Sequence, residues 1–159
     1  MKINNFDLIT SDLENKEHLT LLEKIIKSNG SELISGDIKR FVERNIELNK
    51  KDNITNCYII ENNNSFIGLA FLNYHPEEKR DEKTLSEEIE IGLGILPEFR
   101  GKHLGSQFEK EFSEYLLNKY PQFNEVVARI DNNNLKSINA VKKAGFEHIE
   151  GEEYHFKRF

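Results

Sequence analysis

Cysteine is scarce and long apolar runs are missing from this 159-residue sequence. The one cysteine, Cys57, excludes an internal disulfide and a cysteine-rich zinc site, because both need several cysteines. No apolar run approaches the roughly 20 residues of a membrane-spanning helix, and residues 1–5 lack the apolar core of a signal peptide. These absences predict a cytoplasmic protein that does not act at a membrane.

Positive charge is also in deficit, with 22 Lys+Arg against 28 Asp+Glu and a formal net charge of −6. A nucleic-acid-binding protein needs a surface that neutralises phosphates, so this balance disfavours a nucleic-acid partner. Apolar residues make up 37% of the chain, with 11 phenylalanines and 5 tyrosines among its aromatics. This is enough for one hydrophobic core, and we expect residues 1–159 to form a single domain.

The spacing of apolar residues predicts an alternation of strands and helices. Strands are expected over residues 3–9, 54–61, 66–74, 89–95, 125–130, 146–149 and 154–159. Helices are expected over residues 19–26, 38–46, from near Gly105 to 119, and 135–144. We expect Gly30 to end the first helix, Asn134 to cap the last one and Gly145 to end it, while the acidic segment 77–90 reads as a solvated loop. This order describes a mixed sheet with helices on its faces, an α+β (mixed α/β) fold and not a doubly wound parallel sheet.

The most informative segment, residues 90–105, passes from an apolar strand through a proline and a glycine-containing loop into a long amphipathic helix. Free N–H groups at a helix N-terminus, with the helix dipole behind them, bind anions. Gly101 and Gly105 allow a phosphate to approach the backbone, and Arg100 and Lys102 add positive charge. The segment therefore predicts a phosphate-binding loop.

Two common phosphate-binding motifs do not match this loop. A Walker A motif needs Ser or Thr after Gly101-Lys102 and an earlier glycine at the position of Leu96, but His103 follows the lysine. The dinucleotide fingerprint that begins at Gly92 fails because Pro97 occupies the place of its third glycine.

Arg100-Gly101-Lys102-His103-Leu104-Gly105 instead resembles the acyl-CoA signature of the GNAT superfamily of N-acetyltransferases, [Arg/Gln]-x-x-Gly-x-[Gly/Ala]. Arg100 and Gly105 match the signature, and His103 departs from it at the first glycine. A second block, from Asn134-Leu135-Lys136-Ser137 to Lys143-Ala144-Gly145-Phe146, resembles the family's Asn-x-x-[Ala/Ser]…Lys-x-Gly-Phe. The resemblance covers residues 88–159 well and the first half only as an order of elements. It implies a GNAT fold, whose central mixed, mostly antiparallel sheet splays at the cofactor site and is flanked by helices.

The resemblance implies that acetyl-CoA (coenzyme A) is the cofactor and assigns residues to its parts. The backbone of Leu93 and Ile95 would pair with the pantetheine arm where two strands splay apart. The pyrophosphate would be held by the loop and the first helical turn, at Arg100, Gly101, Lys102, His103, Leu104, Gly105 and Ser106. The thiol end would be bordered by Asn134, Ser137 and Asn139, and the outer phosphates would meet Lys142 and Lys143.

The family often places a glutamate on the strand before this loop, so Glu90 is the expected general base, with Glu88 on the same face as second choice. The competing interpretation makes both glutamates only the solvated face of a strand. Many members protonate the leaving thiolate with a tyrosine at the position of Val141, which has no proton to give. Tyr154, water or unaided departure of the thiolate are the alternatives. No metal is expected, because no histidines in the sequence have metal-like spacing.

The resemblance implies an enzyme, an acetyltransferase that moves the acetyl group of acetyl-CoA to a primary amine by direct attack in a ternary complex. The acceptor is a small-molecule amine or a protein amine, and the acidic segment 77–90 favours a cationic one if it lines the acceptor cleft. The alternative from another class is a non-catalytic acyl-CoA-binding module, which Val141 favours. A third is a helix-rich interaction protein without a cofactor. Pairing through a sheet edge is common in the superfamily, so the resemblance also allows a homodimer.

Overall fold

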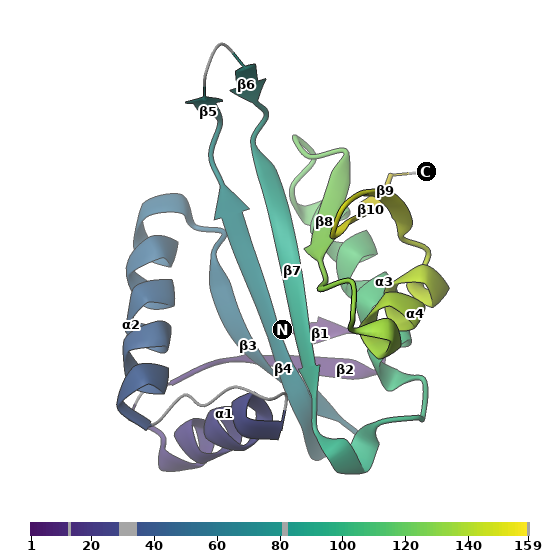
Figure 1. Ribbon diagram of the computed structural model, residues 1–159. Coiled ribbons are helices and arrows are strands. Elements are labelled where there is room, and N and C mark those ends of the chain that lie inside the picture. The colour runs from purple at the N-terminus through teal and green to yellow at the C-terminus, as the bar shows by residue number, and fades with distance from the viewer. Residues whose placement is uncertain (13, 29–34, 81–82, 159) are drawn as a thin grey trace.

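The computed structural model describes residues 1–12, 14–28, 35–80 and 83–158, so the helix stop expected at Gly30 lies outside the described residues. Its main feature is an eight-stranded mixed sheet (Figure 1). In spatial order the strands are β1 (Lys2–Ile3), β2 (Phe6–Thr10), β3 (Asn56–Asn62), β4 (Ser65–His75), β7 (Glu88–Ile95), β8 (Glu125–Arg129), β10 (Glu153–Lys157) and β9 (Glu147–Glu150). The α+β expectation is confirmed.

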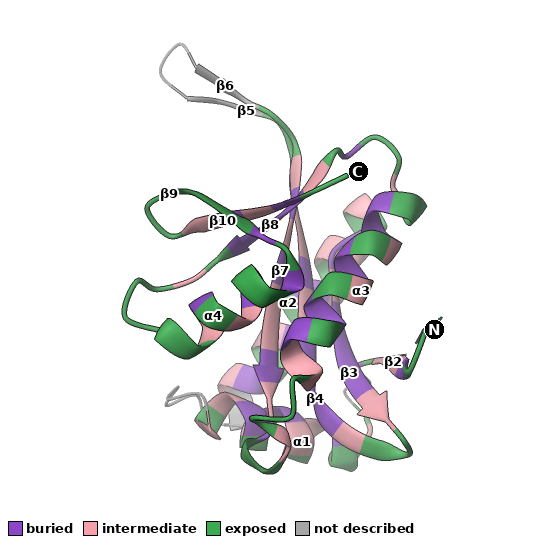
Figure 2. Cartoon of the chain, turned by 90° about the vertical axis from the view of Figure 1, so that its right-hand side faces the viewer, coloured by how far each residue is buried: buried purple, intermediate pink, exposed green. Residues whose placement is uncertain are grey.

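Helices cover both faces of this sheet (Figures 1 and 2). On one face, Leu22 of α1 (Lys16–Ser28) and Ile38 of α2 (Ser35–Asp52) are buried in a core cluster with strand residues of β3 and β4. On the other face, Phe108 and Phe112 of α3 (Leu104–Lys119) are buried in a second cluster, to which α4 (Leu135–Ala144) contributes Val141. We call these the α1/α2 face and the α3/α4 face.

Strand β7 presents different residues to the two faces because successive side chains of a strand point in opposite directions. Ile89 and Ile91 are buried in the cluster of the α3/α4 face, and Leu93 and Ile95 pack against it. Glu88, Glu90, Gly92 and Gly94 therefore alternate onto the α1/α2 face. The apolar and polar alternation predicted for residues 89–95 is confirmed, and it places both glutamates on one side of the sheet.

The parallel pair β7 and β8 interrupts an otherwise antiparallel sheet, and the pair is short. Residue pairs form only at Ile89 with Val126 and at Glu90 with Val127. On its other side β7 pairs with β4 along its whole length, from Glu88 to Ile95. After Glu90, the edge of β7 that faces β8 pairs with no other strand of the described structure. We call this the free edge of β7. The splayed sheet expected from the resemblance is present.

Two expectations for strands and loops were wrong. Segment 77–90 is not a loop throughout, because β5 (Glu78–Arg80) and β6 (Lys83–Leu85) pair as an antiparallel ribbon between β4 and β7. The expected strand over 3–9 is a hairpin of β1 and β2, turning at Asn4, whose φ of 46° lies in the left-handed region that asparagine tolerates. A short 3₁₀ turn, η1 (Pro97–Phe99), follows β7.

None of the described helices is both long enough and apolar enough to cross a membrane.

Candidate active site

Helix α3 begins with a set of unused hydrogen-bond donors. Its N-cap residue, His103, has a left-handed backbone with a φ of 61° and makes no side-chain cap, and Gly101 before it has a φ of 77°. The first backbone bond of the helix runs from Gln107 N to His103 O, at 3.1 Å. Within the described residues, the backbone N–H groups of residues 101–106 donate to no acceptor. Together with the helix dipole, these free N–H groups are of the kind that can bind an anion.

Arg100 is used for internal contacts at this site. Its backbone N–H donates to Pro97 O at 3.2 Å. The Arg100 amide is therefore already hydrogen-bonded, unlike the amides of residues 101–106. Its side-chain Nε donates to Ile95 O at 2.9 Å, and its Nη2 lies 3.3 Å from both the carbonyl and the hydroxyl oxygen of Ser28. The arginine of the signature thus connects the end of β7 to the end of α1.

A lysine of α4 supplies positive charge at the start of α3. Lys143 Nζ lies 2.8 Å from Nδ1 of His103, whereas Lys142 is also exposed but has no such contact in the described structure. Lys102 lies over the Phe99 ring, with its Nζ 5.4 Å from the ring centroid. A phosphate bound to the free amides would therefore also meet the Lys143 ammonium.

Helix α4 has the predicted ends. Asn134 is its N-cap, with its side-chain oxygen accepting from Ser137 N at 3.2 Å, and Gly145 ends it with a φ of 102°. Ser137 is half-buried and Asn139 is exposed. Val141 is buried in the core of the α3/α4 face and carries no titratable group.

The free edge of β7 lies against the start of α3. A Cβ atom added at Gly105 would stand 3.6 Å from Leu93 Cδ2 and 3.7 Å from Ile95 Cγ1. The expected partners of the pantetheine arm, Leu93 and Ile95, and the amides of residues 101–106 are therefore brought together. This proximity puts an extended edge and an anion site in one place.

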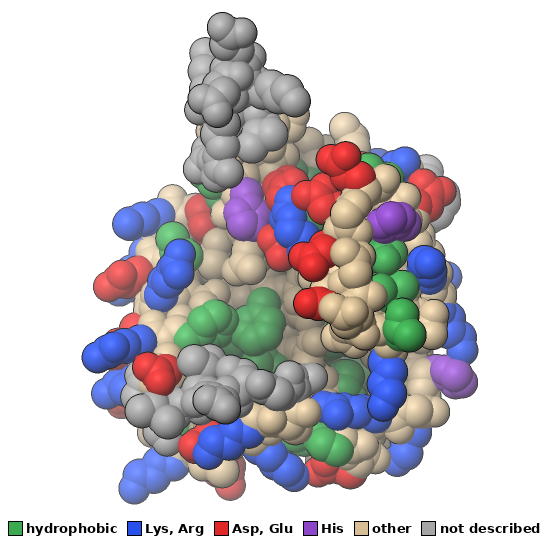
Figure 3. Space-filling model, viewed as in Figure 1, with side chains coloured by type: hydrophobic (Ala, Val, Ile, Leu, Met, Phe, Trp, Pro, Cys, Tyr) green, Lys and Arg blue, Asp and Glu red, His purple; other side chains and the backbone are tan. Residues whose placement is uncertain are grey.

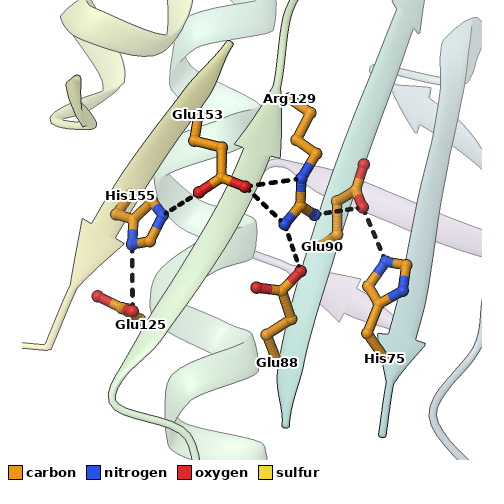
Figure 4. A network of polar contacts seen from close by, with 7 residues as sticks. All are labelled: His75, Glu88, Glu90, Glu125, Arg129, Glu153 and His155. Atoms are coloured by element: carbon orange, nitrogen blue, oxygen red, sulfur yellow. Dashed lines mark hydrogen bonds and ion pairs between the residues drawn. The ribbon is translucent and has the colours of Figure 1, made fainter. Parts of the chain in front are cut away.

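A charged cluster occupies the α1/α2 face near the start of β7, made of His75, Glu88, Glu90, Arg129 and Glu153 (Figure 4). We call it the Arg129 cluster. The Arg129 guanidinium lies 2.6 Å from Glu88, 2.8 Å from Glu90 and 2.9 Å from Glu153. Figure 3 shows acidic, basic and histidine side chains gathered over these strands, above a hollow with hydrophobic side chains at its floor.

The cluster carries more negative than positive charge. Burial alone would lower the pKa of Arg129, but its hydrogen bonds to Glu88 and Glu153 and the charge of Glu90 raise that pKa above its usual value. Burial opposes ionisation of Glu153 as well, yet Arg129 and His155 lower the pKa of its carboxyl. One guanidinium thus faces three carboxylates, which suits a cationic ligand.

Sequence reasoning missed His75, and the strand register brings it to the cluster. His75 is the last residue of β4 and pairs with Glu88, and its Nε2 lies 2.8 Å from Glu90 Oε2. One ligand atom from each of His75, Glu88 and Glu90 lies within 4.8 Å of the others, a spacing that could hold a metal ion. The Arg129 guanidinium already contacts both carboxylates, so we do not assign a metal to them.

Two other sequence expectations are placed as follows. Tyr154, the alternative proton donor, is buried on the α3/α4 face, with its ring centroid 4.9 Å from that of His148. It thus lies on the opposite side of the sheet from Glu90. The acidic segment 77–90 would favour a cationic acceptor if it lined the acceptor cleft, but the side chains of residues 78–85 within it lie outside the described structure. Glu87 accepts a hydrogen bond from the Tyr74 hydroxyl at 2.8 Å.

Comparison with known proteins places the chain in a family. The sequence model of the acetyltransferase (GNAT) domain matches residues 12–147. Among solved structures, aminoglycoside acetyltransferase AAC(6')-Ib with coenzyme A and kanamycin is 20% identical, with a TM-score of 0.70 over 97% of this chain and 94% of that one. The Salmonella typhimurium acetyltransferase that modifies the N-terminal serine of ribosomal protein L7/L12 is 15% identical, with a TM-score of 0.72 over 98% and 96%. No curated protein matches the chain. The chain belongs to the GNAT acetyltransferase domain family.

Proposed function

We propose that this protein is an acetyl-CoA-dependent N-acetyltransferase that acts on a primary amine. The observation that carries the proposal is the meeting of the unpaired N–H groups of residues 101–106 with the free edge of β7 beyond Glu90. This combination fits a ligand that has a diphosphate at one end and amide groups along an extended arm. Coenzyme A has both, and structural relatives of the chain are solved with coenzyme A bound.

The proposed binding mode uses backbone groups more than side chains. The amides of residues 101–106 hold the diphosphate, with Lys143 beside them, and the edge at Leu93 and Ile95 pairs with the amide-containing arm. His103 does not prevent this, because its side chain is directed to Lys143 while its backbone keeps the left-handed turn. Ser137 and Asn139 at the start of α4 are proposed to border the thiol end.

Acetyl-CoA supplies an activated acetyl thioester, and the protein must supply a neutral amine. An alkylamine with a pKa near 10.4 is neutral only about 0.04% of the time at pH 7, so loss of its proton must be assisted. Glu90 is the carboxylate proposed to promote this loss, and Glu88 is the second candidate. Both lie on the α1/α2 face near the point where β7 and β8 separate.

The acceptor is proposed to be cationic, either a small molecule or a protein amine. The excess of carboxylates in the Arg129 cluster supports this, since an ammonium group approaching it is attracted. Among the structural relatives, one is an aminoglycoside acetyltransferase and another modifies the N-terminal serine of a ribosomal protein. Both kinds of acceptor belong in the same screen.

The test combines ligand binding with turnover. Coenzyme A should raise the melting temperature, and acetyl-CoA should release free thiol when polyamines, aminoglycosides, amino-terminal peptides or lysine peptides are added. Stabilisation without thiol release for any amine would replace the enzyme with a non-catalytic acyl-CoA-binding module, an outcome that the inert Val141 makes worth testing. Absence of any stabilisation by coenzyme A would overturn both.

A further inference from the structure

We infer that His75 is the group that takes the proton from the acceptor amine, and that Glu90 acts by orienting His75 and stabilising its charged form. The inference rests on the proposed function and assigns a residue to it that the sequence pattern did not indicate. It starts from the 2.8 Å contact between His75 Nε2 and Glu90 Oε2 (Figure 4).

The contact fixes which nitrogen of His75 is available. Glu90 Oε2 also accepts a hydrogen bond from Arg129 Nη1 at 2.8 Å, so this oxygen belongs to a carboxylate that is already ion-paired. A carboxylate accepts hydrogen bonds only, so His75 must donate its Nε2–H to it. In a neutral imidazole the other nitrogen, Nδ1, is then the acceptor. Within the described structure, Nδ1 of His75 has no partner.

An imidazole suits this task better than either carboxylate. As a class, the imidazolium group has a pKa about two units above that of a carboxylic acid, so imidazole is the stronger base. The charged groups of described residues that face His75 are Glu88 and Glu90 of β7 and, beyond them, Arg129 of β8. A positive charge that forms on His75 is paired with the Glu90 carboxylate, whose Oε2 lies 2.8 Å from Nε2.

His75 lies closer to solvent than Glu90 does. The Glu90 side chain is 21% exposed and that of His75 is 47% exposed. A proton held on His75 can therefore pass to bulk water, which must happen once in every turnover. Glu90 is the less exposed of the two and is held by the Arg129 guanidinium beside it, so it has the position of a fixed support.

The step balances without any further reactant. One N–H bond of the acceptor ammonium breaks, directly or through one water molecule, and one N–H bond forms at Nδ1 of His75. The electron pair stays on the amine nitrogen, which becomes the nucleophile. The second proton, lost from that nitrogen as the amide forms, equals the one that the leaving thiolate takes up. One net proton leaves through His75, and Glu90 stays ionised.

The experiment compares H75A and H75Q with the wild type in the thiol-release assay, using the best amine from the screen. Gln at position 75 keeps an N–H donor for Glu90 but takes up no proton. We expect both variants to lose kcat by about 100-fold or more, with KM for acetyl-CoA within about twofold of the wild type. Imidazole in the buffer should restore part of the rate of H75A, because position 75 is open to solvent, and should leave the wild type unchanged. The pH profile of both variants should lack one ionisation of the wild type.

His148, an exposed histidine on β9 outside the Arg129 cluster, provides the matched control, and H148A should keep the wild-type rate with no response to imidazole. Full activity of H75Q would show that His75 only supplies a hydrogen bond and would overturn the inference. Loss of rate in H75A without rescue by imidazole would overturn it as well. If the wild type releases no thiol with any amine, the proposed function fails. If the wild type and H75Q are both active, the proposed function stands and only the role of His75 fails.

Discussion

The Arg100 side chain donates to the carbonyl oxygen of Ile95 at 2.9 Å, and this contact holds the last residue of β7 against the loop that leads into α3. The same guanidinium reaches Ser28 at the end of α1. The Arg100 side chain is thus used to position the loop that leads into α3, which is the proposed phosphate-binding loop. The loop's own amides are left for a ligand.

Replacement of Arg100 by alanine should therefore lower stability. Loss of these hydrogen bonds amounts to about 1 kcal/mol or more, which corresponds to a melting temperature roughly 2–4 °C lower. Thermal unfolding by circular dichroism measures it. Arg44→Ala on α2, an exposed arginine, is the control and should change the melting temperature by less than about 1 °C. Equal effects of the two substitutions would contradict the anchoring role.

The protein should be less stable with histidine at position 103 than with glycine there. A non-glycine residue in the left-handed region is destabilised by about 1 kcal/mol, and His103 has a φ of 61°. His103→Gly is expected to raise the free energy of unfolding by about this amount in a urea titration. His103→Ala, which loses the side chain but keeps a Cβ, should give no such gain. A gain with alanine as large as that with glycine would locate the strain in the imidazole instead.

Lys143 should contribute to coenzyme A affinity. Its Nζ stands beside His103 at the start of α3, so Lys143→Gln removes a positive charge from the proposed diphosphate site. We expect the Kd for coenzyme A to rise about three- to fivefold in calorimetry at low salt, with a smaller effect at high salt. Lys110→Gln, on an exposed part of α3, is the charge-matched control and should leave Kd unchanged. Similar losses for both variants would indicate only a long-range effect of net charge.

Glu90→Gln should slow turnover without weakening cofactor binding. The substitution keeps the size of the side chain but removes the negative charge next to His75 and Arg129. A fall in kcat of about 100-fold, with an unchanged Kd for coenzyme A, is expected in the thiol-release assay. Glu125→Gln on β8, which contacts His155 and does not contact Arg129, serves for comparison. An unaltered rate for Glu90→Gln would reject Glu90 from the proton-transfer machinery.

Glu109 on α3 should make stability depend on pH. Burial raises the pKa of its carboxyl from 4.5 to about 8, and its Oε2 has no hydrogen-bond partner among the residues that the structure describes. The unfolded chain therefore gives up this proton at lower pH than the folded one. The stability that the proton provides is complete below pH 4.5 and is lost as pH rises to about 8.

Glu109→Gln removes this ionisation. The variant should match the wild type near pH 4 and exceed its melting temperature at pH 8 by a gap on the order of 10 °C. Parallel melting curves from pH 4 to 8 measure the gap. Glu114→Gln, exposed on the same helix, should show none. A constant difference between Glu109→Gln and the wild type across this range would mean that Glu109 is ionised in the folded protein.

Local signals explain what could be predicted from sequence. Asn134 and Gly145 mark the ends of α4 because an N-cap oxygen and a left-handed C-terminal residue act within a few positions of the chain. The alternation along β7 predicted its two faces and put Glu88 with Glu90, since it depends only on neighbouring residues. The loop and helix of residues 100–105 likewise form a continuous segment.

The parts that could not be predicted depend on register between distant residues. His75 meets Glu90 because β4 and β7 pair over eight residues, and the polar segment between them gave no sign of that alignment. Arg129 reaches the same carboxylates from β8, through a parallel pairing that spacing along one strand does not reveal. The β5–β6 ribbon was missed because its residues are mostly charged, a composition typical of loops, although they extend the neighbouring pair of strands.

The brevity of the β7–β8 pairing has a mechanical consequence. Only two residue pairs among the described residues join β7 to β8, so few backbone contacts connect the strands β1–β4 and β7 with the strands β8–β10 of the same sheet. Helix α3 bridges the two groups of strands, because Phe108 and Phe112 are buried in a cluster that contains side chains from both groups. A ligand bound at the first turn of α3 and along the free edge of β7 would therefore connect the two groups of strands. The protein should become more rigid as this site is filled.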